Sequence, residues 1–176
     1  MSGHSKWSQI KHRKEATDKK KAVVFSKLLK AISIAAKTEP NPDFNPRLRT
    51  AVETAKQNNV PNDNIERAIS KASEQKNLEE ITVEAYGPES VALMVEAVTD
   101  NRNRTIQEIK NILNENGGKM GEMGSVRWAF EQPVPGGEWK PKFPQTLSDA
   151  GAEALAKLVD AIEECEDVQR VFTNAE

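Results

Sequence analysis

The spacing of apolar residues changes once along this chain of 176 residues, near residue 77. Before that point, apolar residues recur every three or four positions, which is typical of amphipathic helices. Beyond it, stretches with alternating apolar and polar residues predict strands, and two helical stretches lie between them. Helices followed by a mixture of strands and helices predict an α+β fold.

Three helices are predicted within residues 1–76. The apolar stripe of the first helix lies at Phe25, Leu28, Leu29, Ile32 and Ala36. Pro46 suits the first turn of the second helix, with Asn45 as its cap, and the third helix opens after Pro61. Because alanine fills many core positions, we expect these helices to approach closely, or this domain to lean on the rest of the chain.

Residues 77–176 are predicted to form a four-stranded sheet with two helices on one face. We expect strands at 81–86, 91–98, 126–131 and 168–172, and helices at 105–116 and from Ser148 onward. Trp128 is predicted to be a core residue because it alternates with polar neighbours in the third strand. The proline-rich segment 132–147 cannot form a regular element, so we predict a linker there that tolerates deletion.

Charge is distributed as unevenly as hydrophobicity. The net charge is −2, but residues 1–76 carry 16 basic and 8 acidic side chains, and residues 77–176 carry 9 and 19. Residues 3–30 alone hold nine basic and two acidic residues around one indole. A basic run that contains an aromatic residue is typical of proteins that bind the phosphate backbone of nucleic acids. The pattern therefore predicts a basic, nucleic-acid-binding domain at 1–76 and an acidic domain at 77–176.

The candidate nucleic-acid-binding residues belong to this basic run and to a later turn that contains two arginines. They are Lys6, Trp7, Lys11, His12, Arg13, Lys14, Lys19, Lys20, Lys21, Lys27, Lys30, Arg102 and Arg104. Trp7 either stacks on an unpaired base or anchors the run on the helical domain. Because residues 2–15 hold few apolar anchors, we expect an arm that becomes ordered only against RNA. About five neutralised phosphates are expected in total.

No motif for catalysis is found, because the chain lacks a Walker loop, a GxGxxG and a GxSxG sequence. We therefore expect no enzyme activity and no cofactor. His4 and His12 are the only histidines and Cys165 is the only cysteine, so no metal site is expected. Acids near Cys165 are expected to raise the pKa of its thiol and keep it unreactive. No stretch is apolar enough to span a membrane, and a cytoplasmic protein is expected.

Several blocks of the sequence, in one order, resemble the YebC/PmpR-type family, which includes mitochondrial translational activators. The blocks are GHSKWSQIKHRKEATDKKKAVVFSKL near the N-terminus, PNDNIERAI at 61–69, TDNRNRT at 99–105, GGKMGEMGSVRWAFE at 117–131 and EDVQRVFTN at 166–174. The resemblance covers nearly the whole chain. It implies a helical domain followed by α/β domains, the third of which members usually carry after the strand that matches 126–131. Segment 132–147 stands in that place here, so the chain resembles a short variant.

The resemblance also implies a cytoplasmic, non-enzymatic protein of gene expression. Family members are widely described as DNA-binding transcriptional regulators, and some are associated with translation on the ribosome. Because no helix evidently presents Asn, Gln and Arg outward to a major groove, we predict that the basic domain binds ribosomal RNA. DNA-binding transcriptional regulation is the alternative, and a protein-interaction module is a further one. No small-molecule substrate and no membrane partner are expected.

Overall fold

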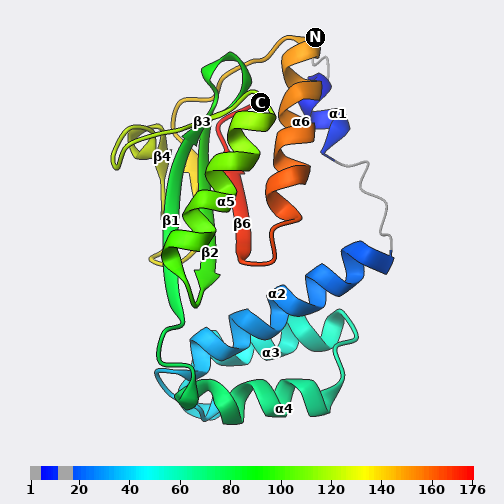
Figure 1. The fold of residues 1–176 in the computed structure, drawn as a ribbon, viewed down its shortest axis with the longest axis vertical. Helices are drawn as coiled ribbons and strands as arrows, with labels where there is room; N and C mark the ends of the chain where they lie inside the picture. The colour runs from blue at the N-terminus through cyan, green and yellow to red at the C-terminus, as the bar shows by residue number, and fades with distance from the viewer. Residues whose placement is uncertain (1–4, 12–17) are drawn as a thin grey trace.

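The computed structural model describes residues 5–11 and 18–176, and the side chains of the second range from Lys20 onward. Figure 1 shows a helical part, residues 18–76, below a sheet part, residues 77–176, with the short helix α1 (Lys6–Ile10) beside the sheet part. The fold is α+β, as predicted. Within the described ranges, no helix combines the length and the apolar character needed to cross a bilayer.

The helical part consists of α2 (Asp18–Ala36), α3 (Pro46–Gln57) and α4 (Asn62–Lys71), with 3-10 turns at Pro42–Phe44 and Ala72–Glu74. The three predicted helices are therefore confirmed. Asn45 caps α3 by accepting a hydrogen bond from the backbone N–H of Leu48 at 3.0 Å, and Pro46 follows it as expected. Ile32 and Leu48 are fully buried among alanines, so these helices do approach closely.

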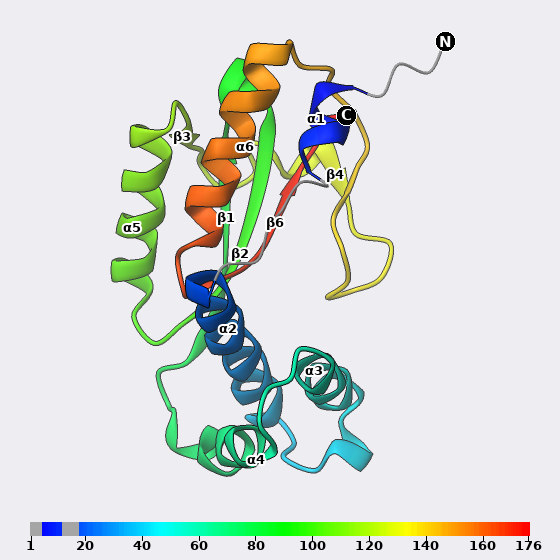
Figure 2. The same cartoon turned by 90° about the vertical axis from the view of Figure 1, so that its right-hand side faces the viewer.

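The main sheet has the strand order β3-β1-β2-β6, and every neighbouring pair is antiparallel. Its strands are β1 (Glu79–Tyr86), β2 (Ala92–Thr99), β3 (Lys119–Met120) and β6 (Val168–Thr173), with a 3-10 turn at Pro88–Ser90 between β1 and β2. Helices α5 (Arg102–Glu115) and α6 (Asp149–Glu163) lie on one side of the sheet, as predicted (Figure 2). Alternate residues of β1 and β2, such as Val83 and Leu93, form the core beneath them.

The strand predicted at 126–131 is wrong. Residues 126–131 lead through a 3-10 turn (Arg127–Ala129) into the short strand β4 (Phe130–Glu131), which lies outside the main sheet. The cause is Glu84, whose buried carboxylate accepts three backbone N–H bonds from residues 124–127 at 2.6–2.9 Å. These bonds turn the chain, so Trp128 is 63% exposed and is not the core residue that the alternation predicted.

The proline-rich segment 132–147 is more than the predicted linker. Its strand β5 (Lys140–Pro141) pairs with β4 on the second side of the main sheet. Trp139 is buried there with Met94 and Phe130, and its indole N–H donates to Glu96 Oε1 at 2.9 Å. Although most of the segment is exposed, Trp139 is buried, so deletion of the whole segment would remove part of a core.

Helix α1 packs against α6 of the sheet part, although α6 lies far from α1 in the sequence. Ser5 caps α1 by accepting a hydrogen bond from the N–H of Ser8 at 3.1 Å. Trp7 is 8% exposed and belongs to the core that α6 shares with the sheet. The anchoring alternative for Trp7 fits this position, although its partner is the sheet part instead of the helical domain. The described portion of the expected arm is thus a short helix packed on the sheet part.

Candidate nucleic-acid interface

Helix α2 carries its candidate lysines in two groups, and the first group lies near its N-terminal end. The apolar stripe at 25–36 packs on α3 and α4. Lys20 and Lys21 precede that contact and are exposed, as is Val24. The first turns of α2 project beyond the ends of α3 and α4 (Figures 1 and 2). A polyanion can therefore approach this end of α2 without disturbing the packed stripe.

The second group, Lys27 and Lys30, faces the sheet part. Lys30 Nζ forms an ion pair with the carboxylate of Asp167, and Lys27 Nζ donates to the backbone oxygen of Glu163. In return, Gln169 Nε2 donates to the backbone oxygen of Lys27 at 3.1 Å. Both lysines therefore join the two parts of the fold, a role that the sequence did not predict.

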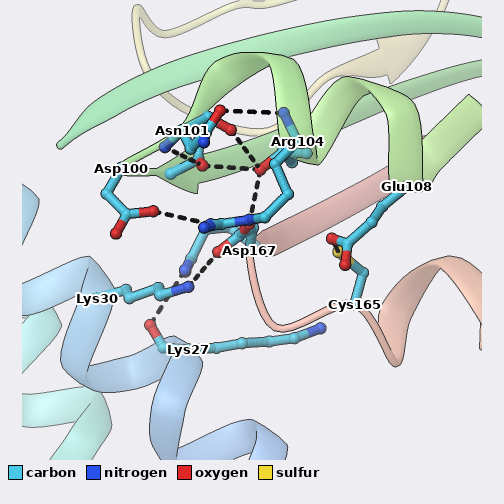
Figure 3. Close-up of polar contacts among 11 residues, drawn as sticks. Lys27, Lys30, Asp100, Asn101, Arg104, Glu108, Cys165 and Asp167 are labelled. Atoms are coloured by element: carbon cyan, nitrogen blue, oxygen red, sulfur yellow. Dashed lines mark hydrogen bonds and ion pairs between the residues drawn. The ribbon is translucent and has the colours of Figure 1, made fainter. Parts of the chain in front are cut away.

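Asp167 is the centre of this contact (Figure 3). Its side chain is 6% exposed and accepts hydrogen bonds from Thr105 Oγ1 at 2.6 Å and Arg104 Nη2 at 3.1 Å, besides the bond from Lys30. Burial alone would raise the pKa of the Asp167 carboxyl, but the bonds from Lys30, Thr105 and Arg104 outweigh burial and hold the pKa below its usual range. We call these four residues the Asp167 latch, because they tie α2 to α5 and to the start of β6.

The two arginines predicted to contact phosphate both have acidic partners. Arg104 Nη2 lies 2.8 Å from Asp100 Oδ1 in addition to its contact with Asp167, and Arg102 Nη1 lies 3.4 Å from Glu79 Oε2. About half of each arginine side chain is exposed, at 47% and 50% respectively. A phosphate could reach these guanidinium groups only in competition with carboxylates.

The N-terminal candidates occupy different environments. Lys6 Nζ lies 3.6 Å from Glu153 Oε1 of α6, Trp7 is buried, and Lys11 is exposed. The candidates His12, Arg13 and Lys14 lie outside the described residues, as does the side chain of Lys19. Lys11, Lys20 and Lys21 are therefore the exposed lysines among the described candidates.

A cleft of about 1240 Å³ lies between the two parts of the fold, beside the Asp167 latch. Its walls come from α2, residues 74–78, α5 and the end of α6. Seven acidic and three basic residues line it, and the acidic ones are Glu74, Asp100, Glu108, Glu115, Glu164, Glu166 and Asp167. Because this lining repels a phosphate backbone, we do not place nucleic acid in the cleft.

Three potential metal ligands also meet in this cleft, since Glu108, Cys165 and Asp167 bring one ligand atom each within 4.8 Å of one another. A cation there would have to replace Lys30 and Arg104 at Asp167. Burial, with the nearby charge of Glu108, raises the pKa of the Cys165 thiol, which keeps its proton and lies 3.5 Å from Glu108 Oε2. We therefore assign no metal to this cluster. The direction of the thiol pKa is as predicted, although burial is the largest cause.

Sequence reasoning missed Asp167. Its partners Thr105 and Lys30 are 62 and 137 positions away, and the residue stands in an acidic run with Glu164 and Glu166. Nothing in the local pattern distinguishes it from these solvated neighbours. The one available signal is its position directly before a strand, in the quoted block at 166–174.

The fold and its surface define a class of two-part α+β proteins, in which a lysine-bearing helix joins a helical part to an antiparallel sheet.

Two family models match this chain. The TACO1/YebC protein N-terminal domain matches residues 5–75, and the TACO1/YebC second and third domain matches residues 78–133. The crystal structure of a conserved hypothetical protein, Aq1575, from Aquifex aeolicus is similar, with a TM-score of 0.86 and 34% identity over 98% of this chain and 97% of that one.

Curated relatives agree with these matches. A "probable transcriptional regulatory protein" of Desulfosudis oleivorans is 39% identical over 237 residues, which cover 99% of this chain and 96% of the relative. A relative with the same description from Chlorobium phaeobacteroides is 49% identical over 88% of this chain, which spans 66% of that relative. The chain therefore belongs to the TACO1/YebC family. Because the first alignment is longer than this chain of 176 residues, the chain is a short variant.

Proposed function

We propose that this protein is a non-enzymatic regulator of gene expression that binds ribosomal RNA and acts in translation in the cytoplasm. The observation that carries the proposal is the exposure of Lys20 and Lys21 at the N-terminal end of α2, before the stripe that packs on α3 and α4. Lysines in this position neutralise phosphates without loss of core contacts. The description of the relatives as transcriptional regulatory proteins supports nucleic acid as the class of partner.

DNA-binding transcriptional regulation is the second candidate, and the names of the relatives favour it. Helices α3 and α4 follow one another across a short turn, the order in which a helix-turn-helix protein places its second helix in a major groove. The beginning of such a helix meets the bases, but here the first turns of α4 expose Asp63 and Glu66. These carboxylates would face phosphates, which supports RNA contact through α2 over groove reading through α4.

The test exchanges Lys20 and Lys21 together for glutamate. Affinity for a structured ribosomal RNA fragment should fall for every sequence alike, because phosphate contacts carry no sequence information. The slope of log affinity against log salt should become shallower by about 1.4 on single strands and about 1.8 on a duplex, if each lysine neutralises one phosphate. The matched control exchanges the exposed Lys110 and Lys157 of the sheet part for glutamate, which changes the net charge equally.

Equal losses in the Lys20/Lys21 and Lys110/Lys157 variants would show that only net charge matters and would remove α2 from the interface. Wild-type protein is also titrated with duplex DNA of the same length as the RNA, at one salt concentration. Tighter binding to RNA is expected. Tighter binding to the DNA duplex would place transcriptional regulation first.

A further inference from the structure

Two large aromatic side chains lie exposed next to each other on the side of the sheet opposite α5 and α6. Trp128 is 63% exposed and Phe143 is 53% exposed. Their ring centroids are 5.5 Å apart with a tilt of 46° between the ring planes. Figure 2 shows β4, which begins two residues after Trp128, on the side of the sheet away from α5. Adjacent exposed aromatic rings offer apolar area that a binding partner can cover.

Hydrogen bonds to a buried side chain fix the backbone of the turn that carries Trp128. The buried carboxylate of Glu84 accepts N–H bonds from Gly124, Val126 and Arg127, which fixes the turn that carries Trp128. The indole N–H of Trp128 donates to the backbone oxygen of Ser125 at 2.8 Å, so the ring has a defined direction and its polar atom is satisfied. What the ring offers to a ligand is therefore its face.

The segment that carries Phe143, just after β5, is attached to the same support. Residue pairs of β4 and β5 are in register, and the N–H of Lys142 donates to the backbone oxygen of Ala129 at 2.8 Å. Glu96 holds the preceding Trp139 through its indole N–H. The two exposed rings thus stand on segments whose positions are set before any ligand arrives, which lowers the entropic cost of binding.

One cation lies beside the exposed ring of Phe143, and a second lies over the buried ring of Trp139. Lys142 Nζ lies 5.9 Å from the centroid of Phe143, and the Arg127 guanidinium lies 5.1 Å from the centroid of Trp139. Residues 119–142 carry four basic and three acidic side chains, although residues 77–176 together carry 9 and 19. The stretch of sequence from residue 119 to residue 142 therefore lacks the excess of acid found in the sheet part as a whole.

We propose that Trp128 and Phe143 form a stacking platform for unpaired bases of single-stranded nucleic acid, with Lys142 next to the phosphates. Aromatic rings take bases of any sequence because every base has a π-face, and neighbouring cations follow the backbone. The platform is a second contact, separate from α2, and it rests on the proposed function only in that its ligand is a nucleic acid. In a regular duplex every base is paired and stacked, so none is available to the platform.

The experiment titrates the full chain with a uridine 12-mer and with an RNA duplex of equal charge. Trp128→Ala and Phe143→Ala should each weaken binding of the single strand by about tenfold, and should change duplex binding much less. The matched controls are Met123→Ala and Val134→Ala, which remove exposed apolar side chains without a ring and should leave both affinities unchanged. Because all four side chains are exposed, the urea midpoints should equal that of wild type.

Tryptophan fluorescence gives an independent readout. Trp7 and Trp139 are 8% and 9% exposed, so stacking should quench chiefly the emission of Trp128. Trp128→Phe should abolish the quenching and retain most of the affinity, because phenylalanine still stacks. Single-strand affinity that is unchanged in Trp128→Ala, or equal losses on single strand and duplex, would overturn the platform and point to a protein partner for this surface.

The Lys20/Lys21 variant separates this proposal from the previous one. If that variant binds like wild type while Trp128→Ala is weakened, the interface on α2 fails and the platform stands. If only the Lys20/Lys21 variant is weakened, the platform fails and α2 stands. The loss in Trp128→Ala should also persist at high salt, where the loss from the lysines shrinks.

Discussion

Replacing Asp167 with asparagine removes the negative charge at the centre of the Asp167 latch and leaves its shape almost unchanged. The asparagine oxygen can still accept from Thr105, but Lys30 loses its ionic partner. Breaking a buried ion pair by removing one member costs about 3–5 kcal/mol. Since 27% of the Lys30 side chain is exposed, water recovers part of this, and we expect a loss of about 2 kcal/mol in the free energy of unfolding.

The positions of the tryptophans make this loss measurable in each part of the fold. Trp7, Trp128 and Trp139 all lie in the sheet part or in α1, and none lies in α2, α3 or α4. Tryptophan emission therefore reports on the sheet part, and circular dichroism at 222 nm also reports on the helical part. In urea the two signals should change together in wild type. In Asp167→Asn the dichroism should begin to change first, because the helical part has lost its buried ion pair with the sheet part.

The control is Glu166→Gln, which removes the same charge from the exposed neighbouring residue and should alter stability by less than about 0.5 kcal/mol. For a chain of this size, 2 kcal/mol corresponds to a fall in Tm of roughly 4–8 °C. An Asp167→Asn protein with the urea midpoint of wild type and coincident transitions would refute the reasoning that the latch couples the two parts.

Two further predictions concern Trp7 and the buried carboxylates. Trp7→Ala should lower the free energy of unfolding by about 3 kcal/mol and expose α1 to proteolysis. Trp7→Phe should lose less of this free energy. Equal protease resistance in Trp7→Ala and wild type would contradict the anchoring role. The pKa values of Glu84 and Asp167 are lowered from ordinary values of 4.5 and 3.8, so their stabilisation is complete above about pH 5.5 and is lost as pH falls through the folded-state pKa values. The combined Glu84→Gln and Asp167→Asn variant should therefore lose less stability than wild type between pH 5.5 and pH 3.5 in urea titrations, and an equal loss would count against both carboxylates.

Elements with a repeating local pattern were predictable from the sequence. The helices of residues 18–76 were indicated by apolar residues at every third or fourth position and by capping residues such as Asn45. Strand β1 was predictable from its alternation, β2 from an almost continuous apolar run that is buried on both faces, and β6 was predicted to within one residue. In these places, local preference and tertiary packing agree.

Elements that depend on a distant partner were not predictable. Strand β3 has only two residues, which are too few to show an alternating pattern. Trp128 follows the alternation of a strand, but the carboxylate of Glu84, 44 positions earlier in the chain, captures the backbone and turns the ring outward. Trp139 lies among prolines and glycines, where no repeat exists to signal burial. At Trp128 tertiary hydrogen bonds override the local pattern, whereas at β3 and Trp139 there is no local pattern to read.

The same distinction applies to the basic run that suggested nucleic acid. Composition counts every lysine as available for phosphate, but Lys27 and Lys30 are engaged at the contact between the two parts of the fold. A phosphate at Lys30 would have to replace Asp167, which would leave that buried carboxylate without one of its cations. Binding at Lys30 and docking of the helical part therefore compete for one ammonium group. Lys20 and Lys21 lie before this contact on the same helix, so they can bind a polyanion while Lys30 keeps its ion pair with Asp167.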